Sequence, residues 1–196
     1  SPGCGVVKSI DRGAKRVLRA VVIELDGDEQ VDFAKYSPDT LASLDAADVV
    51  KNLTESGLWT AFKTRPFSKI PNPTTRPVDI HVSVMDTNPL AADPCVIVSA
   101  DADAFKNGLT VISRLTSGKV YVSKAVGADF VVPDVVELNE FSGPHPAGLS
   151  GTHLHFISPV SANKVAWTMG YQDVIAVGEL FTTGCLSVER VISLAG

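Results

Sequence analysis

Hydrophobic and polar positions alternate at the start of the chain, in two runs that flank a turn sequence. Residues 5–25 contain two segments rich in valine and isoleucine, and Asp11-Arg12-Gly13 lies between them. Alternation with a period of two indicates a β-strand, and a glycine-containing turn between two such runs indicates a hairpin. The sequence therefore predicts a β-hairpin over residues 5–25 and one further short strand over residues 31–33.

The hydrophobic spacing changes from two to three and four after Ser37. Tyr36-Ser37-Pro38-Asp39 is a turn that can cap a helix, and apolar residues recur at helical spacing through residues 41–58. We therefore expect one or two amphipathic helices that end near Gly57. Four prolines follow within residues 65–77. Because proline has no N–H and disfavours helix at the residue before it, this stretch is predicted to be an extended connection.

Strand and helix patterns alternate in the second half of the chain. Residues 78–85 fit a strand, residues 102–115 carry an apolar helical stripe, and residues 120–122 fit another strand. A strand, a helix and a strand of these lengths predict a βαβ unit with parallel strands. The remaining predicted elements are a strand at 135–141, a loop at 142–152, a helix at 170–181 and a strand at 188–194.

The composition is that of a globular α/β protein of ordinary size. The 196 residues are 45% hydrophobic and carry a net charge of -5, with no Lys/Arg run longer than two. This charge gives no general attraction for nucleic acid, which is not an expected partner. Uninterrupted apolar runs are about four residues long, against about 20 for a membrane-spanning helix, so no direct membrane span is expected.

Three cysteines occur far apart, at Cys4, Cys95 and Cys185. Their odd number and the absence of a CxxC pair argue against a disulfide framework or an iron–sulfur cluster. We expect them to be small core residues in a reducing, cytoplasmic setting. The chain begins at Ser1 without methionine and stops at Gly196, so both ends read as boundaries within a longer protein.

Three histidines gather in a segment rich in glycine and proline, at His145, His153 and His155. If this segment ends as a strand, His153 and His155 share one face and could ligate zinc or iron together with His145. The segment holds no cysteine or carboxylate, and Glu140 is too distant to be assumed a ligand. No metal site is therefore predicted, and a rigid loop with structural or subunit-contacting histidines is the favoured interpretation.

Other chemistries lack their sequence signatures. The chain contains no GxGxxG or GxxxxGK[ST] motif, and the 142–152 loop is not expected to lead into a helix, so no standard nucleotide site is predicted. Serine hydrolysis would need a GxSxG elbow, which is absent. The residues available for such a triad are Ser142 or Ser150, His145 or His153, and Asp134 or Asp173. We predict no catalytic residue.

Aromatic and cationic residues lie close together after the predicted helix. Trp59, Phe62 and Phe67 are interleaved with Lys63 and Arg65. A flat, polarised quinone or flavin ring suits such a pocket, although packing of the helix end into the core is the alternative.

Six stretches along the chain are long enough to identify a family. They are Pro2-Gly3-Cys4-Gly5-Val6-Val7 with residues 12–18, Thr64-Arg65-Pro66-Phe67 with residues 68–71, residues 85–91, residues 145–153, Tyr171-Gln172-Asp173 with residues 174–176, and residues 180–184. Together, and in this order, they resemble the A subunit of the bacterial sodium-translocating NADH:quinone reductase. The chain is similar to a fragment of that protein that lacks N-terminal and C-terminal parts.

The resemblance implies a fold. This family is similar to the flavin-bearing NADH subunit of respiratory complex I, so residues 1–36 are expected to end a lipoyl-like β module and residues 78–196 to form a Rossmann-like α/β domain. Residues 37–77 would be a helical and proline-rich linker. Residues 56–63 stand where related flavoproteins carry a glycine-rich loop, which implies that the cofactor site has been abandoned.

The resemblance also implies a role. The fragment would belong to a peripheral subunit on the cytoplasmic side of the bacterial inner membrane, within a six-subunit translocase that passes electrons from NADH to ubiquinone and exports sodium ions. FAD, FMN and iron–sulfur centres would lie on other subunits. The alternative is a flavin- or quinone-binding enzyme domain in its own right.

Two groups of residues are expected to carry these contacts. A quinone or other ligand would contact Trp59, Phe62, Arg65, Phe67 and His155. Partner subunits would contact the loops that contain Arg65, Pro66, His145 and His153.

Overall fold

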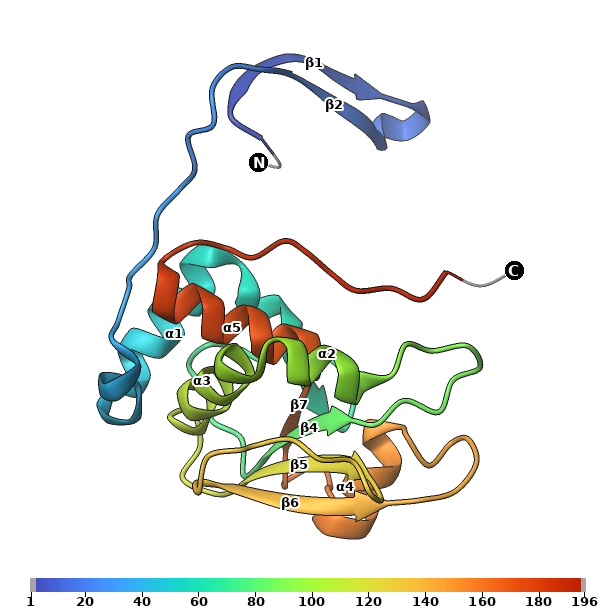
Figure 1. Cartoon of the computed structure of the whole chain (residues 1–196). Helices are drawn as coiled ribbons and strands as arrows, with labels where there is room; N and C mark the ends of the chain where they lie inside the picture. The colour runs from blue at the N-terminus through green and yellow to red at the C-terminus, as the bar shows by residue number, and fades with distance from the viewer. Residues whose placement is uncertain (1–2, 195–196) are drawn as a thin grey trace. The chain divides into compact units, whose positions relative to one another are not determined.

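The first 32 residues form a unit of their own, in which two strands pair with each other. The computed structural model describes residues 3–194, and the chain divides into one unit that ends at Asp32 and a second that begins at Phe33. Strands β1 (Gly5–Arg12) and β2 (Leu18–Leu25) are antiparallel, and a short 3₁₀ turn, η1 (Ala14–Arg16), lies between them (Figure 1). The predicted hairpin is confirmed.

The prediction of a further strand at residues 31–33 is wrong. No strand among residues 3–194 pairs with this segment, which is irregular. Its end is instead attached to the second unit's own elements: Phe33 N–H donates to the Gly184 carbonyl at 2.8 Å, and Asn52 Nδ2 donates to the Ala34 carbonyl at 3.0 Å. The Phe33 N–H and the Ala34 carbonyl are therefore hydrogen-bonded to a helix end and to a side chain, and not to a neighbouring strand.

A five-stranded sheet forms the middle of the second unit, in the order β3-β7-β4-β5-β6. Strand β4 is parallel to both β5 and β7, β5 is parallel to β6, and β3 is the antiparallel edge. The strands are β3 (Lys63–Arg65), β4 (Ile80–Val84), β5 (Val120–Ala125), β6 (Val136–Phe141) and β7 (Ala166–Gly170). The parallel βαβ unit predicted from residues 78–122 is confirmed.

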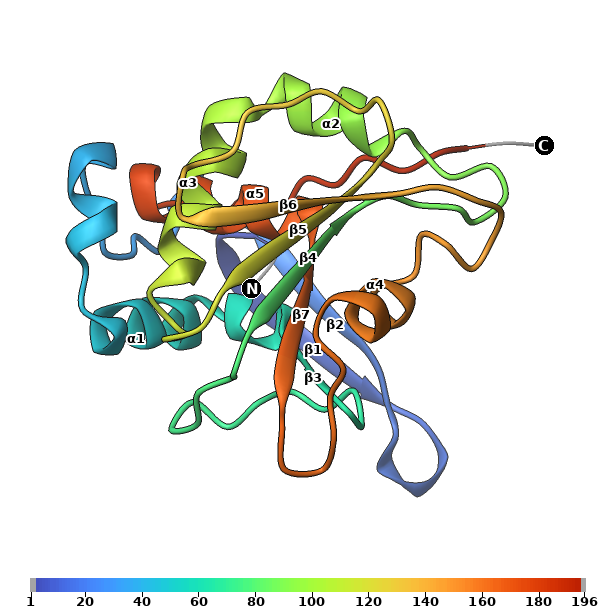
Figure 2. The ribbon, with the colours of Figure 1, turned by 90° about the horizontal axis from the view of Figure 1, so that it is seen from below.

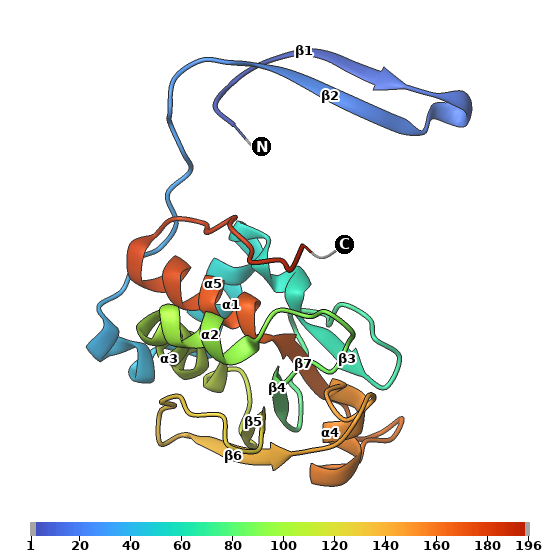
Figure 3. The ribbon, with the colours of Figure 1, turned by 45° about the vertical axis from the view of Figure 1, so that its right-hand side comes forward.

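Helices cover the two faces of this sheet unequally. One face carries α1 (Ala46–Ser56), α2 (Pro94–Ala100), α3 (Ala102–Ser113) and α5 (Tyr171–Thr183) (Figure 3). The other carries only the short α4 (Ser150–Ile157) (Figure 2). Two 3₁₀ segments, η2 (Pro38–Ser43) and η3 (Leu58–Ala61), flank α1, so residues 37–77 pack within the second unit. No helix among residues 3–194 has the length and apolarity needed to cross a bilayer.

The core follows from the patterns of the strands and helices. On β4, Ile80, Val82 and Val84 are buried toward the larger helical layer. Helices α1, α3 and α5 each bury an apolar stripe, as the spacing of three and four predicts. Gly57, at φ 83°, ends α1 in the left-handed conformation that glycine adopts without steric cost, at the predicted position.

Two further elements differ from the prediction. The predicted loop at 142–152 gives way to α4 at Ser150, so this loop does lead into a helix. Residues 188–194 are not a strand. Instead, Gln172 replaces a neighbouring strand: Val191 N–H donates to its side-chain oxygen, and its side-chain nitrogen donates to the Val191 carbonyl, both at 2.9 Å. Residues 1–2 and 195–196, which belong to the predicted domains, lie outside the described residues.

Two glycines set the distance between α3 and α5. A Cβ atom on Gly178 would lie 1.8 Å from the Ala104 carbonyl oxygen, and one on Gly108 would lie 2.0 Å from the Val174 carbonyl oxygen. The backbones of the two helices therefore meet directly. Close approach of this kind places both helices on the same face of β4 and β5.

We predict that Gly178→Ala lowers the free energy of unfolding by about 2 kcal/mol or more, because the added methyl has to push α5 away from α3. Urea unfolding followed by circular dichroism measures this. Gly151→Ala is the matched control, since its Cβ would meet no atom within 4 Å, and it should change stability by less than about 1 kcal/mol. Equal effects of the two substitutions would contradict the close contact.

Candidate functional site

The carboxyl edge of the parallel strands is the natural place for a site in this sheet. The chain leaves β4 toward β5 on one side, whereas β7 lies on the other side of β4. Crevices in open α/β sheets form where the strand order reverses in this way, beyond the carboxyl ends of the strands. Two loops meet at this edge, residues 85–93 after β4 and residues 142–149 after β6.

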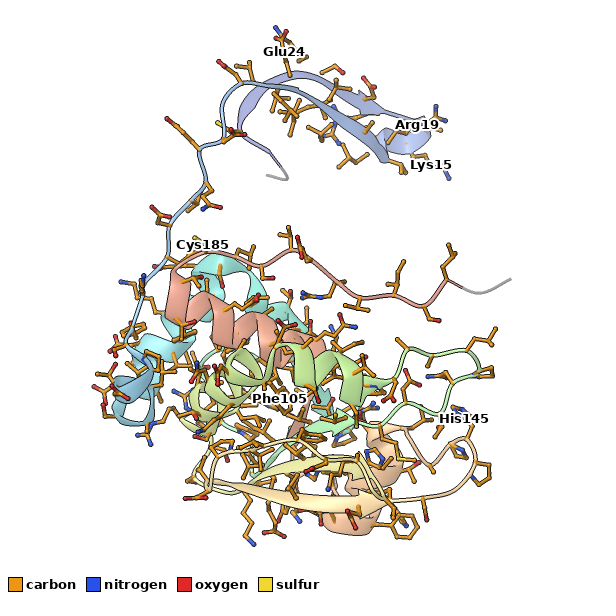
Figure 4. All side chains as sticks on the ribbon, viewed as in Figure 1. Lys15, Arg19, Glu24, Phe105, His145 and Cys185 are labelled. Carbon is orange, nitrogen blue, oxygen red and sulfur yellow. The ribbon has the colours of Figure 1, made fainter. Side chains whose placement is uncertain are left out.

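Thr87 joins the two loops. Gly148 N–H donates to Thr87 Oγ1 at 3.0 Å, and Thr87 Oγ1 lies 3.2 Å from His145 Nδ1. A Cβ atom on Gly148 would lie 2.6 Å from the Thr87 nitrogen, so only glycine permits this approach. His145, labelled in Figure 4, is exposed. It is held on an ordered loop, as the structural interpretation of the histidine segment predicts.

Carboxylates give this edge a negative character. Burial raises the pKa of Tyr171, at the start of α5, and the charges of Asp86 and Asp93 raise it further. Asp86 accepts from the Asn88 backbone and side chain at 2.8 and 2.7 Å, and Asp93 caps α2 through Cys95 N–H at 2.9 Å. Both carboxylates are thus fixed near the end of α5 where an anion would otherwise bind, which disfavours a phosphate there.

A polar layer lies beneath α4, on the less covered face of the sheet. His81 on β4 is 2% exposed and stacks on Tyr121 with ring centroids 4.9 Å apart. Within residues 3–194, neither ring nitrogen of His81 has a hydrogen-bond partner, and the same holds for Ser123 Oγ on β5. Burial lowers the pKa of His81 to about 4, because the charged imidazolium would lose its hydration.

The histidines of the sequence segment do not share one face. Residues 153 and 155 lie on helix α4 rather than on a strand, so His153 is buried and His155 is exposed. His153 Nε2 donates to the Ala147 carbonyl at 2.7 Å, and its ring lies 4.3 Å from that of Phe141. Burial lowers the pKa of His153, partly offset by this hydrogen bond. No cluster of three metal-ligating side chains occurs among the described residues.

The aromatic residues proposed for ligand contact separate into two environments. Trp59 and Phe62 are buried, and their ring centroids lie 5.4 and 5.3 Å from that of Trp167 on β7. Phe67 is 73% exposed on the connection after β3. His155 is exposed on α4. The structure therefore brings Trp59 and Phe62 together as core residues and leaves Phe67 and His155 apart from them.

The loop that carries Phe67 is ordered by its own hydrogen bonds. Thr64 N–H donates to the Lys69 carbonyl at 2.7 Å, and Ser68 N–H donates to the Thr64 carbonyl at 2.8 Å. Arg65 Nη1 donates to Ser68 Oγ at 2.9 Å. Phe67 itself adopts φ 83°, a conformation that is unfavourable for a bulky residue. The loop thus holds a phenylalanine outward at a cost in backbone strain.

Two other sequence hypotheses can be compared with the contacts. The residues available for a hydrolase triad have different partners: His145 contacts Thr87, His153 bonds Ala147, and Asp173 accepts from Arg190 at 3.1 Å. No triad is thereby assembled among them. The cysteines, expected in the core, are instead half-buried. Burial, followed by the charge of Asp93, raises the pKa of the Cys95 thiol.

A hollow that the sequence did not indicate lies between α5, the end of α2 and the final described residues. Its volume is about 160 Å³, and its lining includes Ile97, Asp101, Gln172, Glu179, Glu189 and Arg190. Pockets for organic ligands are usually about 300 Å³ or more. Its lining includes Gln172, Ile175 and Ala176 of the 171–176 stretch, which the sequence pattern predicts as part of a helix and not as a site.

The chain is similar to one protein family along its whole length. A family described as the NqrA second alpha/beta domain matches residues 44–186. The A subunit of the Na(+)-translocating NADH-quinone reductase of Pasteurella multocida is 59% identical, and the proteins of the same name from Pseudomonas aeruginosa and Neisseria gonorrhoeae are 56% and 55% identical. Each match covers 100% of this chain but 44% of the relative, so the chain spans less than half of these relatives' length.

We predict that acid destabilises this fold through His81. Because its pKa is lowered to about 4 in the folded state, its contribution is complete above its unfolded pKa of about 6.5 and is lost as the pH falls toward 4, by about 3 kcal/mol in total. His81→Phe keeps a ring against Tyr121 and should show a correspondingly flatter profile of unfolding free energy between pH 7 and 4. Identical pH slopes in the two proteins would contradict this assignment.

Proposed function

This chain belongs to the family of the A subunit of the Na(+)-translocating NADH-quinone reductase, and we propose that it is a structural, quinone-associated segment of such a subunit. It supports electron transfer from NADH to ubiquinone coupled to Na⁺ export, without a catalytic residue of its own. FAD, FMN and iron–sulfur centres act on the other subunits of the six-subunit complex. The subunit is peripheral, on the cytoplasmic side of the bacterial inner membrane.

The finer fold assignments are part of this proposal. The parallel order β6-β5-β4-β7, with the reversal beside β4, supports a Rossmann-like domain. The exposed two-stranded hairpin supports the end of a lipoyl-like module, because two strands alone are marginally stable and fit a larger β unit.

The exposed ring of Phe67 is the main observation that supports the proposed docking role. The side chain of Phe67 is 73% exposed and leaves most of its apolar area unburied, yet the hydrogen bonds of its loop hold its backbone at a strained φ of 83°. Large aromatic side chains on rigid supports are typical anchors of protein interfaces. We therefore assign partner contact to the loop of residues 65–77, with residues 142–155, which comprise the loop after β6 and the first part of α4, as a second contact.

The carboxyl edge of the sheet supports a structural role in place of cofactor binding. Asp86 and Asp93 place two negative charges near Tyr171, where the phosphates of a flavin or dinucleotide would need a positive field. Helix α5 begins at Tyr171, directly after β7, but its first turn also contains Asp173. The fold thus has a position that resembles a nucleotide-binding site, but its charge is negative where a phosphate would need a positive one.

The alternative, a ligand-binding domain in its own right, rests on the same loop. The ring of Phe67 is exposed beside Arg65, and a flat quinone could stack on it in part. Trp59 and Phe62 could contribute only by leaving the buried cluster with Trp167.

We predict that Phe67→Ala weakens assembly with the other subunits by about 30-fold or more, since truncation of an interface anchor costs about 2 kcal/mol. The full-length subunit is titrated against the complex that lacks it, and affinity is measured by co-purification. Val96→Ala is the control, because Val96 is 67% exposed on α2, outside both assigned contacts. Unchanged affinity of Phe67→Ala would reject this contact.

A second prediction distinguishes the docking role from the alternative of a ligand-binding domain. Isothermal titration of the isolated chain with a short-chain ubiquinone should show no saturable micromolar binding if the loop only docks, and tryptophan emission should stay constant. Saturable binding at about micromolar strength, near 8 kcal/mol, with a quench that Phe67→Ala removes, would establish a working pocket in this segment instead.

A further inference from the structure

The turn between β1 and β2 concentrates positive charge that the total of -5 conceals. Arg12, Lys15, Arg16 and Arg19 lie within eight residues, and all four are exposed. None of them takes part in an ion pair with another residue in the described stretch 3–194, whereas Lys8 is paired with Glu24 on the neighbouring strand. Figure 4 shows Lys15 and Arg19 at the turn and Glu24 toward the other end of the hairpin.

The backbone of this turn is fixed and strained. Gly13 N–H donates to the Val17 carbonyl at 2.8 Å, and Arg12 Nη1 donates to the Arg16 carbonyl at 3.2 Å. Lys15 and Arg16 have φ of 53° and 63°, in the left-handed region that glycine or asparagine usually occupies in hairpin turns. Two long cationic side chains thus occupy positions where they cost conformational energy, a combination that is frequent at functional sites.

Apolar side chains accompany the charges. Val17 and Leu18 directly follow Arg16 and are 64% and 56% exposed. Residues 26–32 after β2 carry four carboxylates and no cation. The first unit is therefore electrically polarised, with a basic and partly apolar turn at one end of the hairpin and an acidic segment following the other.

We propose that the turn of residues 12–19 binds the anionic surface of a lipid bilayer. Basic side chains near an anionic leaflet are attracted without specific geometry, and neighbouring apolar side chains enter the boundary between headgroups and acyl chains. The carboxylates of residues 26–32 are repelled, so the hairpin approaches with its turn first. The inference rests on the proposed function only in that a respiratory complex places the subunit beside a membrane.

An acidic protein surface fits this turn less well. A specific protein interface buries about 800 Å² on each partner, from about 20–30 residues. The turn offers eight residues at the end of a two-stranded hairpin. Electrostatic attraction to a charged bilayer needs no such area, because each cation contributes independently.

Vesicle sedimentation of the full-length subunit tests the proposal. Binding should be measurable on vesicles of phosphatidylglycerol and phosphatidylcholine, absent on phosphatidylcholine alone, and weaker as salt rises from low to about 0.5 M. Each cation near the surface is worth about five-fold in affinity, so Lys15→Gln with Arg16→Gln should lower the partition coefficient by about 25-fold.

Lys51→Gln with Lys106→Gln is the matched control. Both lysines are exposed on helices of the second unit, and the change in net charge is the same. This control should bind vesicles as the unaltered protein does. Circular dichroism and the antiparallel amide signals of the hairpin in NMR confirm that the turn variant is folded.

Several results would overturn the proposal. They are equal losses in both double variants, no loss in the turn variant, or no binding to anionic vesicles at low salt. Loss of assembly with the other subunits in the turn variant, without any vesicle binding, would assign the turn to an acidic protein surface. Because vesicle binding requires no other subunit, its failure is distinguishable from a failure of the Phe67 docking contact.

Discussion

The alternation of strand β4 is the constraint on which the second unit depends. Its even-numbered residues Ile80, Val82 and Val84 are buried under α3 and α5, while His81 and Ser83 face α4. Because β4 has parallel neighbours on both sides, the same division extends to β5 and β7. A slip of one residue would bury the polar set in the larger core, so the register is strongly specified.

Both loops at the carboxyl edge inherit their positions from this strand. Ser83 Oγ donates to the Met85 carbonyl and, more weakly at 3.4 Å, to the Gly148 carbonyl, while Thr87 accepts from Gly148 N–H. The loop after β6 is therefore attached to the end of β4, and α4 begins from a fixed point. The same attachment brings a negative edge, through Asp86, to the position where related folds hold anions. The charge of this edge, rather than its backbone geometry, disfavours an anion here.

The sequence predicted the elements whose pattern is local. The hairpin, α3, α5 and the end of α1 at Gly57 follow from the spacing of hydrophobic residues and from the turn and capping residues alone. Prediction from the sequence failed where contacts between distant parts of the chain decide the local structure. Strand β7 is nearly all buried and shows no alternation, α2 is a seven-residue helix without a full stripe, and Val191 is paired by the side chain of Gln172. Near the candidate site, the loop after β6 was predicted as far as Ser150, but the helical placement of His153 and the burial of Trp59 against Trp167 depend on packing.

The first unit differs from the second in how little apolar surface it buries. Its strands expose apolar side chains such as Val6, Ile10 and Val21 and bury none fully, so the hydrophobic effect contributes little to its order. A hairpin with this pattern gains stability when further strands cover one of its faces, and the relatives extend well beyond the 44% that this chain spans. The covering of a strand face leaves residues 13–17 of the turn unaffected, because they project past the last strand pair, Arg12 with Leu18. Completion of the module would therefore stabilise the support of the basic turn while leaving its charges available to a partner.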